Sequence, residues 1–167
     1  MEKIKIVFLG TAASTPTKER GLSSVALKRK GEWFLFDCPE GTQRQMLGCG
    51  VSMLKIKSIF ISHLHADHVL GIPGLVATMS IHQRDYPLTI FGPSGIRKMV
   101  LQAIHASIMN VNFEMRFVEL GKGTCLKGDD YFVRSFPLRH EVECFGFSFN
   151  EEGKSGEFQR QKALDLG

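Results

Sequence analysis

Three histidines and an aspartate lie within six residues near the middle of this chain, as His63, His65, Asp67 and His68. Imidazole and carboxylate groups suit zinc, manganese or iron, and their close spacing lets one turn of backbone aim several lone pairs at a common point. The apolar run at residues 58–61, directly before them, has the β-branched and aromatic content of a buried strand. Because α/β proteins usually place ligands at the carboxyl ends of strands, the pattern predicts a metal site there.

The pattern His-Leu-His-Ala-Asp-His resembles the signature of the metallo-β-lactamase superfamily, and three further segments narrow the resemblance to the ribonuclease Z family. They are Pro-Thr-Lys-Glu-Arg at 16–20, Asp-Cys-Pro-Glu-Gly-Thr-Gln at 37–43, and His140 followed by Phe-Gly-Phe at 145–147. That family trims the 3′ ends of precursor tRNAs. The likeness extends over the whole chain, and it is more specific than the HxHxDH pattern, which lactonases, glyoxalases, sulfatases and nucleases share.

The resemblance implies a fold, a metal centre and a substrate. The fold would be α/β, a metallo-β-lactamase-like αββα sandwich of which this chain supplies mainly the first half. His63, His65 and His140 would hold one zinc ion, while Asp67 and His68 would face a second. Asp67 would also be the catalytic residue, orienting the attacking water and accepting its proton. The substrate would be precursor tRNA, and the complete enzyme a homodimer.

The last part of the chain departs from the resembled family. No histidine follows His140, and neither the bridging aspartate nor the last metal-binding histidine of the second half of ribonuclease Z is present. Residues 1–150 would form the metallo-β-lactamase-like domain, and residues 151–167 resemble the beginning of a protruding tRNA-binding arm. We therefore expect the amino-terminal half of a longer protein. The intact site would hold two zinc ions, whereas this chain alone would bind about one and be inactive.

Asp37 ends the apolar run at residues 33–36, and two roles are compatible with that position. Its carboxylate could cap the helix predicted for residues 41–47. It could instead accept the spare N–H of a metal-binding imidazole and thereby fix the tautomer that leaves the other nitrogen free. We favour the second role, in which Asp37 supports the metal centre without binding the ion.

Two segments carry basic residues that could contact RNA. Residues 11–21 form a polar, proline-containing loop long enough to suggest a function. In the resembled family this loop lies at the mouth of the site, so Lys18 and Arg20 are expected to bind substrate. The family loop commonly continues with Asn where this chain has Gly21, which leaves open whether tRNA that already bears CCA is rejected. The basic trio at 28–30 is interpreted as a solvated hairpin tip.

Hydrophobic patterning predicts alternating strands and helices. Strands are expected at 3–9, 24–28, 32–37, 58–61, 88–91, 113–120, 131–137 and 145–150, and helices at 41–47, 72–83 and 96–108. The apolar faces of the two longer helices, including Ile108, are expected in the core. Ser94 is a candidate cap for the last helix. His82 and His105 are expected to be structural or exposed.

Length and composition are those of one ordinary globular domain. The chain has 167 residues and a net charge of +4, which permits an RNA partner without proving one. No apolar run approaches the roughly 20 residues of a membrane span, and the lysine-interrupted start does not resemble a signal peptide. We therefore expect a cytoplasmic protein. The four cysteines form no CxxC pair, and they are expected to be reduced and mostly buried.

Two other functions remain open on the sequence alone. The first is another hydrolase of the same superfamily, a phosphodiesterase or lactonase acting on a small molecule. Lys18, Arg20 and the residues after Gly153 argue against it, because such an enzyme has no use for an RNA-binding arm. The second is a noncatalytic RNA-binding half in which the metal motif is a structural staple.

Overall fold

The structure is a computed structural model that describes residues 4–121, 123 and 125–152. The beginning of an RNA-binding arm is expected at residues 151–167, of which Glu151 belongs to the last strand and residues 153–167 lie outside the described residues. The strands are β1 (Lys5–Gly10), β2 (Ser24–Arg29), β3 (Glu32–Phe36), β4 (Ile56–Phe60), β5 (Leu88–Gly92), β6 (Met115–Glu119), β7 (Cys125–Lys127), β8 (Tyr131–Pro137) and β9 (Phe145–Glu151). The helices are α1 (Thr42–Cys49), a 3-10 turn (Met53–Lys55), α2 (Ala66–Val69), α3 (Ile72–Ile81) and α4 (Ile96–Ala106).

The first six strands form one mixed sheet in chain order. β1, β2 and β3 pair antiparallel, whereas β3, β4, β5 and β6 pair parallel. The parallel half requires crossover connections, which the segments carrying α1, α2 with α3, and α4 supply. As a result the carboxyl ends of β3, β4 and β5 meet at one edge of the sheet, where the histidine motif begins.

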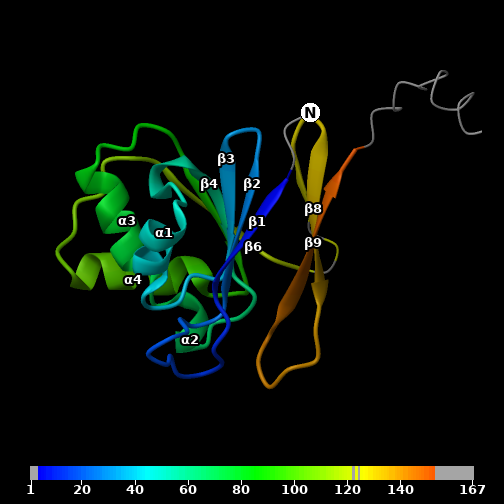
Figure 1. Cartoon of the computed structure of the whole chain (residues 1–167), viewed down its shortest axis with the longest axis horizontal. Helices are drawn as coiled ribbons and strands as arrows, with labels where there is room; N and C mark the ends of the chain where they lie inside the picture. Colours follow the sequence, from blue (N-terminus) through cyan, green and yellow to red (C-terminus); the bar gives the residue numbers. More distant parts are fainter. Residues whose placement is uncertain (1–3, 122, 124, 153–167) are drawn as a thin grey trace, which may run out of the picture.

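Three layers are visible in Figure 1: helices on one side, the six-stranded sheet in the middle, and a smaller sheet of β7, β8 and β9 on the other side. The core between helices and sheet is aliphatic and includes Ile59, Met79 and Val100. The core between the two sheets is aromatic and includes Phe60 and Phe91, whose rings stack with centroids 4.8 Å apart. This layer order confirms the expected α/β fold.

The tip of the β2–β3 hairpin joins the two sheets at the end away from the histidine motif. Arg29 is only 5% exposed, and its guanidinium contacts Asp130 Oδ2 at 2.7 Å and Glu151 Oε1 at 2.7 Å. The interpretation of residues 28–30 as a solvated tip is therefore wrong for Arg29, because carboxylates of the second sheet lie against it. The hydrogen bond from Arg29, with a second from Lys30, holds the pKa of the Asp130 carboxyl well below its usual range.

The ends of α4 also differ from expectation. The helix stops at Ala106, and Ile108 lies beyond it with φ 52° and 95% exposure, so it is not part of the core. The residue that precedes the helix is Gly95 at φ 90°, and no side chain caps the amino end. Ser94 is therefore not the cap, because the backbone turns through the glycine instead.

The expectation that the cysteines are mostly buried is also wrong. Of the three whose side chains the structure describes, Cys38 is buried, Cys144 is half-buried and Cys49 is exposed, and all three are free thiols. Burial raises the pKa of the Cys38 thiol, and the charge of Asp37 adds to this effect. Among the described residues, no helix has the length and apolar character needed to cross a membrane.

Candidate metal centre

Three histidine side chains converge beyond the carboxyl ends of the parallel strands. His63 and His65 follow β4, while His140 comes from the loop that connects β8 to β9 in the second sheet. One ligand nitrogen from each lies within 4.8 Å of the other two. The ring centroids of His65 and His140 are each 4.7 Å from that of His63. The cluster fits a metal site.

The backbone after β4 is held by close contact with the segment after β3. The N–H of Cys38 donates to the carbonyl of His68 at 2.9 Å, and the N–H of Gly71 donates to the carbonyl of Cys38 at 2.9 Å. A Cβ atom at position 71 would lie 2.0 Å from the carbonyl oxygen of Pro39, so only glycine permits this approach. The two segments together fix the direction in which α2 leaves the sheet.

Asp37 lies beneath the cluster and accepts three hydrogen bonds. Its Oδ1 accepts from the N–H of Ser62 at 2.8 Å, and its Oδ2 accepts from Ser62 Oγ at 2.9 Å and from His68 Nδ1 at 2.8 Å. It does not cap α1, whose capping residue is Gly41. The carboxylate therefore orients His68, with the Nε2 nitrogen on the opposite side of the ring from Asp37.

Ser62 is a second organising residue, and sequence reasoning missed it. The single proton of the Ser62 hydroxyl is donated in the hydrogen bond to Asp37 Oδ2. The Ser62 oxygen, 2.9 Å from Nδ1 of His63, therefore accepts the Nδ1–H of that ring. That tautomer leaves the Nε2 lone pair of His63 free for a metal. Burial, reinforced by the charge of His68, lowers the pKa of His63 to about 4, so its imidazole is neutral near pH 7.

Asp67 and His68 lie next to each other at the side of the three-histidine cluster. Asp67 Oδ2 is 3.6 Å from His68 Nε2, and it accepts the N–H of Ser14 at 3.0 Å. Burial acts to lower the pKa of His68, but the hydrogen bond and charge of Asp37, with the charge of Asp67, outweigh it and raise that pKa. Ser14 has φ 58°, and the loop of residues 11–21 that contains it lies beside α2 in Figure 1.

The loop that carries His140 is exposed, yet three hydrogen bonds fix its path. The N–H of Leu138 donates to the carbonyl of Cys144 at 2.8 Å, and the N–H of Phe145 donates to the carbonyl of Ser62 at 2.9 Å. Glu143 Oε2 accepts the N–H of Ser94 at 2.8 Å, which ties the loop to the end of β5. Glu143 was not expected from the sequence, since nothing near it in the chain reveals its partner.

The two proposed substrate-binding residues, Lys18 and Arg20, are both exposed. Lys18 lines a hollow of about 450 Å³ between the 11–21 loop and α1, together with Arg44, whereas Arg20 does not line it. His82 and His105 are exposed at the end of α3 and on α4, as expected.

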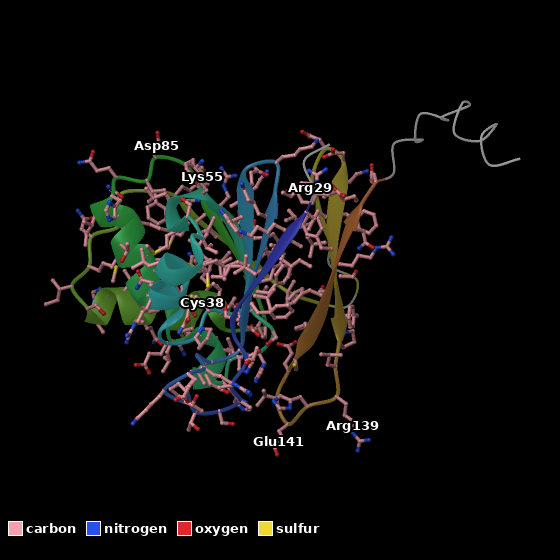
Figure 2. All side chains as sticks on the ribbon, viewed as in Figure 1. Arg29, Cys38, Lys55, Asp85, Arg139 and Glu141 are labelled. Atoms are coloured by element: carbon pink, nitrogen blue, oxygen red, sulfur yellow. The ribbon has the colours of Figure 1, made fainter. Side chains whose placement is uncertain are left out.

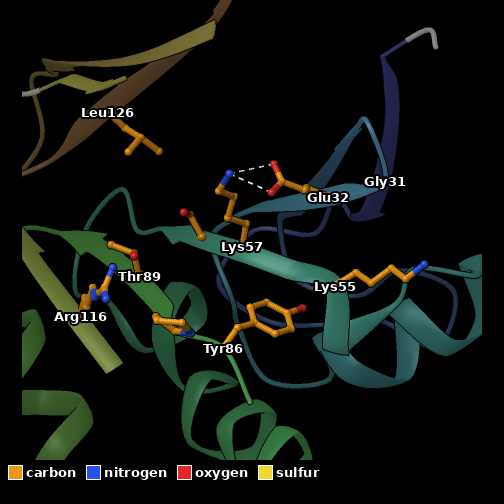
Figure 3. Close-up of a pocket in the computed structure, with 10 residues that line it drawn as sticks. Gly31, Glu32, Lys55, Lys57, Tyr86, Thr89, Arg116 and Leu126 are labelled. Carbon is orange, nitrogen blue, oxygen red and sulfur yellow. Dashed lines mark hydrogen bonds and ion pairs between the residues drawn. The ribbon is translucent and has the colours of Figure 1, made fainter. Parts of the chain in front are cut away.

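A second cleft, of about 350 Å³, lies at the opposite, amino-terminal ends of β4, β5 and β6 (Figure 3). Two of the three cations that line it are paired: Lys57 contacts Glu32 at 2.8 Å, and Arg116 contacts Glu114 at 2.8 Å. Figure 2 shows Lys55 and Asp85 at this end of the molecule, and Arg139 and Glu141 at the other end, beside the metal centre. The second cleft is thus remote from the histidine cluster.

Comparisons with known proteins agree with this geometry. The model of the family described as anti-Pycsar protein Apyc1 matches residues 4–135. Ribonuclease Z of Methanosarcina mazei is 44% identical over 98% of this chain and 54% of the relative, and ribonuclease Z of Bacillus cereus is 38% identical over 98% and 55%. The chain spans about half the length of the curated relatives it matches.

Solved structures agree with the sequence comparisons. Human tRNase Z, short form, matches with a TM-score of 0.81 and 34% identity, over 88% of this chain and 64% of that one. The metallo-β-lactamase fold protein YhfI of Bacillus subtilis matches with a TM-score of 0.71 and 17% identity, over 88% and 57%, and shows the fold. This chain therefore belongs to the family described as anti-Pycsar protein Apyc1, has the metallo-β-lactamase fold and is a relative of the ribonucleases Z.

Proposed function

We propose that the protein to which this chain belongs is a zinc-dependent endoribonuclease that removes 3′ trailers from precursor tRNA and leaves a 3′-hydroxyl on the tRNA. The observation that carries the proposal is the convergence of His63, His65 and His140 in a chain 38–44% identical to ribonucleases Z. The same likeness supports a cytoplasmic location and a homodimer. Light scattering on the complete protein would test whether it is a dimer.

The donor set suits zinc. His63, His65 and His140 would hold one ion through three nitrogens, and Asp67 and His68 would contribute to a second position. Because those two residues make an incomplete ligand set, the second position requires donors beyond them. Zinc, when bound, lowers the pKa of water and neutralises charge that gathers on phosphate oxygens.

The chain's own residues would position the reactants. Asp67 is held by the Ser14 amide and would orient the attacking water and accept its proton. Asp37 would act through His68, because its hydrogen bond fixes the ring and the tautomer. Lys18 and Arg20 would contact phosphates of the RNA, whose scissile linkage must be single-stranded to enter a cleft.

A cleavage assay on the complete protein tests the proposal. Labelled precursor tRNA should be cut just after the unpaired nucleotide that follows the acceptor stem. Asp67→Ala should abolish turnover and leave tRNA binding nearly intact, because the carboxylate acts in the chemical step. Asp85→Ala is the matched control, since Asp85 is an exposed aspartate at the far end of the molecule. Equal cleavage of an unstructured RNA of the same length would indicate a general nuclease instead.

One observation favours a second candidate. The family model that matches residues 4–135 is named for Apyc1 and not for a ribonuclease. Another hydrolase of this fold, a phosphodiesterase or lactonase acting on a small molecule, therefore belongs in the same experiment. Turnover of a chromogenic phosphodiester or lactone without any cleavage of precursor tRNA would favour this candidate. Binding of tRNA with no turnover of any substrate would indicate an RNA-binding half.

A further inference from the structure

The hollow lined by Lys18 and Arg44 lies between the 11–21 loop and α1, and these two segments pack against each other at its base. One wall is the loop, and the other is α1, and Gly21 lies between them against Gln45. A Cβ at position 21 would come within 3.2 Å of the Gln45 side chain, so glycine lets the loop pack closely on the helix. The loop tip is itself ordered, because Thr17 Oγ1 accepts the N–H groups of Glu19 and Arg20 at 3.2 and 3.0 Å.

Both walls are connected to the metal centre by short paths. The loop is bonded to it through the Ser14 N–H and Asp67, four residues before Lys18. The α1 wall is bonded to it through the Cys38 N–H and the carbonyl of His68, just before Glu40. An RNA strand whose scissile phosphate lies at the histidine cluster would therefore have neighbouring phosphates near this hollow.

The charges that line the hollow suit an anion. Lys18 and Arg44 contribute two cations against the single carboxylate of Glu40. In the described part of the chain neither cation has an ion-pair partner, in contrast to Lys57 in the opposite cleft. The helix that carries Arg44 is fixed to α3, because the neighbouring Gln43 accepts a hydrogen bond from Thr78 of α3 at 2.6 Å. Guanidinium binds phosphate through two parallel hydrogen bonds, which makes arginine a specific phosphate contact.

We infer that the hollow between residues 11–21 and α1 binds a backbone phosphate of RNA, with Arg44 and Lys18 as its cationic contacts. The inference rests on the proposed ribonuclease function and adds Arg44, which no sequence motif indicated, to the substrate-binding surface. The site holds RNA beside the metal centre and takes no part in the chemical step.

The experiment uses the complete zinc-loaded protein and precursor tRNA. Arg44→Ala and Lys18→Ala should each raise KM several-fold at unchanged kcat and unchanged bound zinc. In an Asp67→Ala background, each should weaken tRNA binding and reduce the slope of log K against log salt by about 0.7 to 1, the value of one lost phosphate contact. Arg44→Lys should recover part of the affinity, because it restores the charge without the two-pronged contact. Lys98→Ala is the matched control, since Lys98 is an exposed cation on α4.

The outcomes separate this inference from the function on which it rests. Wild-type cleavage with an unchanged KM and salt slope in Arg44→Ala would overturn the inference alone. A loss of affinity equal to that of Lys98→Ala would overturn it too, because it would reflect net charge and not a site. Failure of the wild-type protein to bind or cleave precursor tRNA would overturn both.

Discussion

Two residues beside the histidine cluster, Asp37 and Ser62, connect His63 to His68 through hydrogen bonds. Asp37 contacts both Ser62 and His68, and Ser62 contacts His63. The bonds to His63 and His68 each place a proton on the Nδ1 atom of the imidazole and leave Nε2 free. The tautomers of two of the motif's three histidines are therefore fixed by the protein before any metal binds.

The first prediction concerns the ligands themselves. His63→Ala or His140→Ala should lower the zinc bound per chain, because each removes one nitrogen of the cluster. His105→Ala should not, since His105 is exposed on α4. Elemental analysis of the purified variants decides the matter. Unchanged zinc in both ligand variants would remove the basis of the metal-centre interpretation.

The second prediction concerns Asp37. Asp37→Asn should weaken zinc affinity about 10- to 100-fold, because an amide cannot replace the charged acceptor shared by Ser62 and His68. Competition with a chromogenic chelator measures the affinity. Asp85→Asn should behave as wild type, because Asp85 is exposed and remote from the site. Equal affinity in both variants would mean that His68 orientation does not matter for binding.

The residues that sequence reasoning could find were those with a pattern of their own. His63, His65, Asp67 and His68 are recognisable because several ligands occur close together in the chain. Ser62 stood in the same stretch without a role, because its partner Asp37 is 25 residues away. Residues that come together only on folding have no periodicity or fixed spacing in the sequence, so sequence patterns do not reveal the hydrogen bonds between them.

At the scale of elements, the β8–β9 loop determines where His140 lies. Glu143→Ala removes the acceptor of the Ser94 N–H, so the loop should lose its tie to the β5 end and zinc affinity should fall several-fold. Glu141→Ala is the matched control, because Glu141 is an exposed glutamate of the same loop. Isothermal titration of zinc into both apo variants compares them. Identical affinities would show that Leu138 and Phe145 alone fix the loop.

At the end of the sheets away from the histidines, the ion pair between Arg29 and Asp130 makes the free energy of unfolding depend on pH. The pKa of Asp130 lies below its ordinary value of 3.8 in the folded protein, so its stabilisation is complete above that value and lost as pH falls below it. Asp130→Asn should therefore flatten the fall in unfolding free energy below about pH 4. Denaturant unfolding at several pH values measures it. Asp129→Asn, at the exposed neighbouring position, should retain the wild-type slope.

The elements were largely predictable, and the exceptions have local causes. Two apolar segments on either side of a basic turn indicated β2 and β3, and 3.6-residue periodicity indicated α3 and α4. β7 was missed because three residues are too few for a period to show. The burial of Arg29 was missed because a basic hairpin tip is ordinarily solvated, and the carboxylates that cover it come from residues 130 and 151.

At the scale of the whole molecule, the two sheets are joined at opposite ends by different chemistry. Arg29 joins them at one end through ion pairs with Asp130 and Glu151. At the other end, beside the histidine cluster, the contacts include the hydrogen bonds from the N–H of Phe145 to Ser62 and from the N–H of Ser94 to Glu143. Between these ends the contact is the aromatic core.

His140 lies in a loop of the second sheet, whereas His63 and His65 follow β4 of the first, so any ion they share is a removable cross-link between the layers. An ion that binds only the closed arrangement stabilises it by mass action, by about 2.7 kcal/mol at a free concentration a hundredfold above Kd. Chelation should therefore speed amide hydrogen exchange in β8 and β9 while leaving β4 and β5 nearly unchanged, as mass spectrometry can resolve. Uniform acceleration would mean that the layers open together. If exchange accelerates only in β8 and β9, then the supply of metal, and not the sequence alone, determines how often the aromatic core between the sheets is exposed to water.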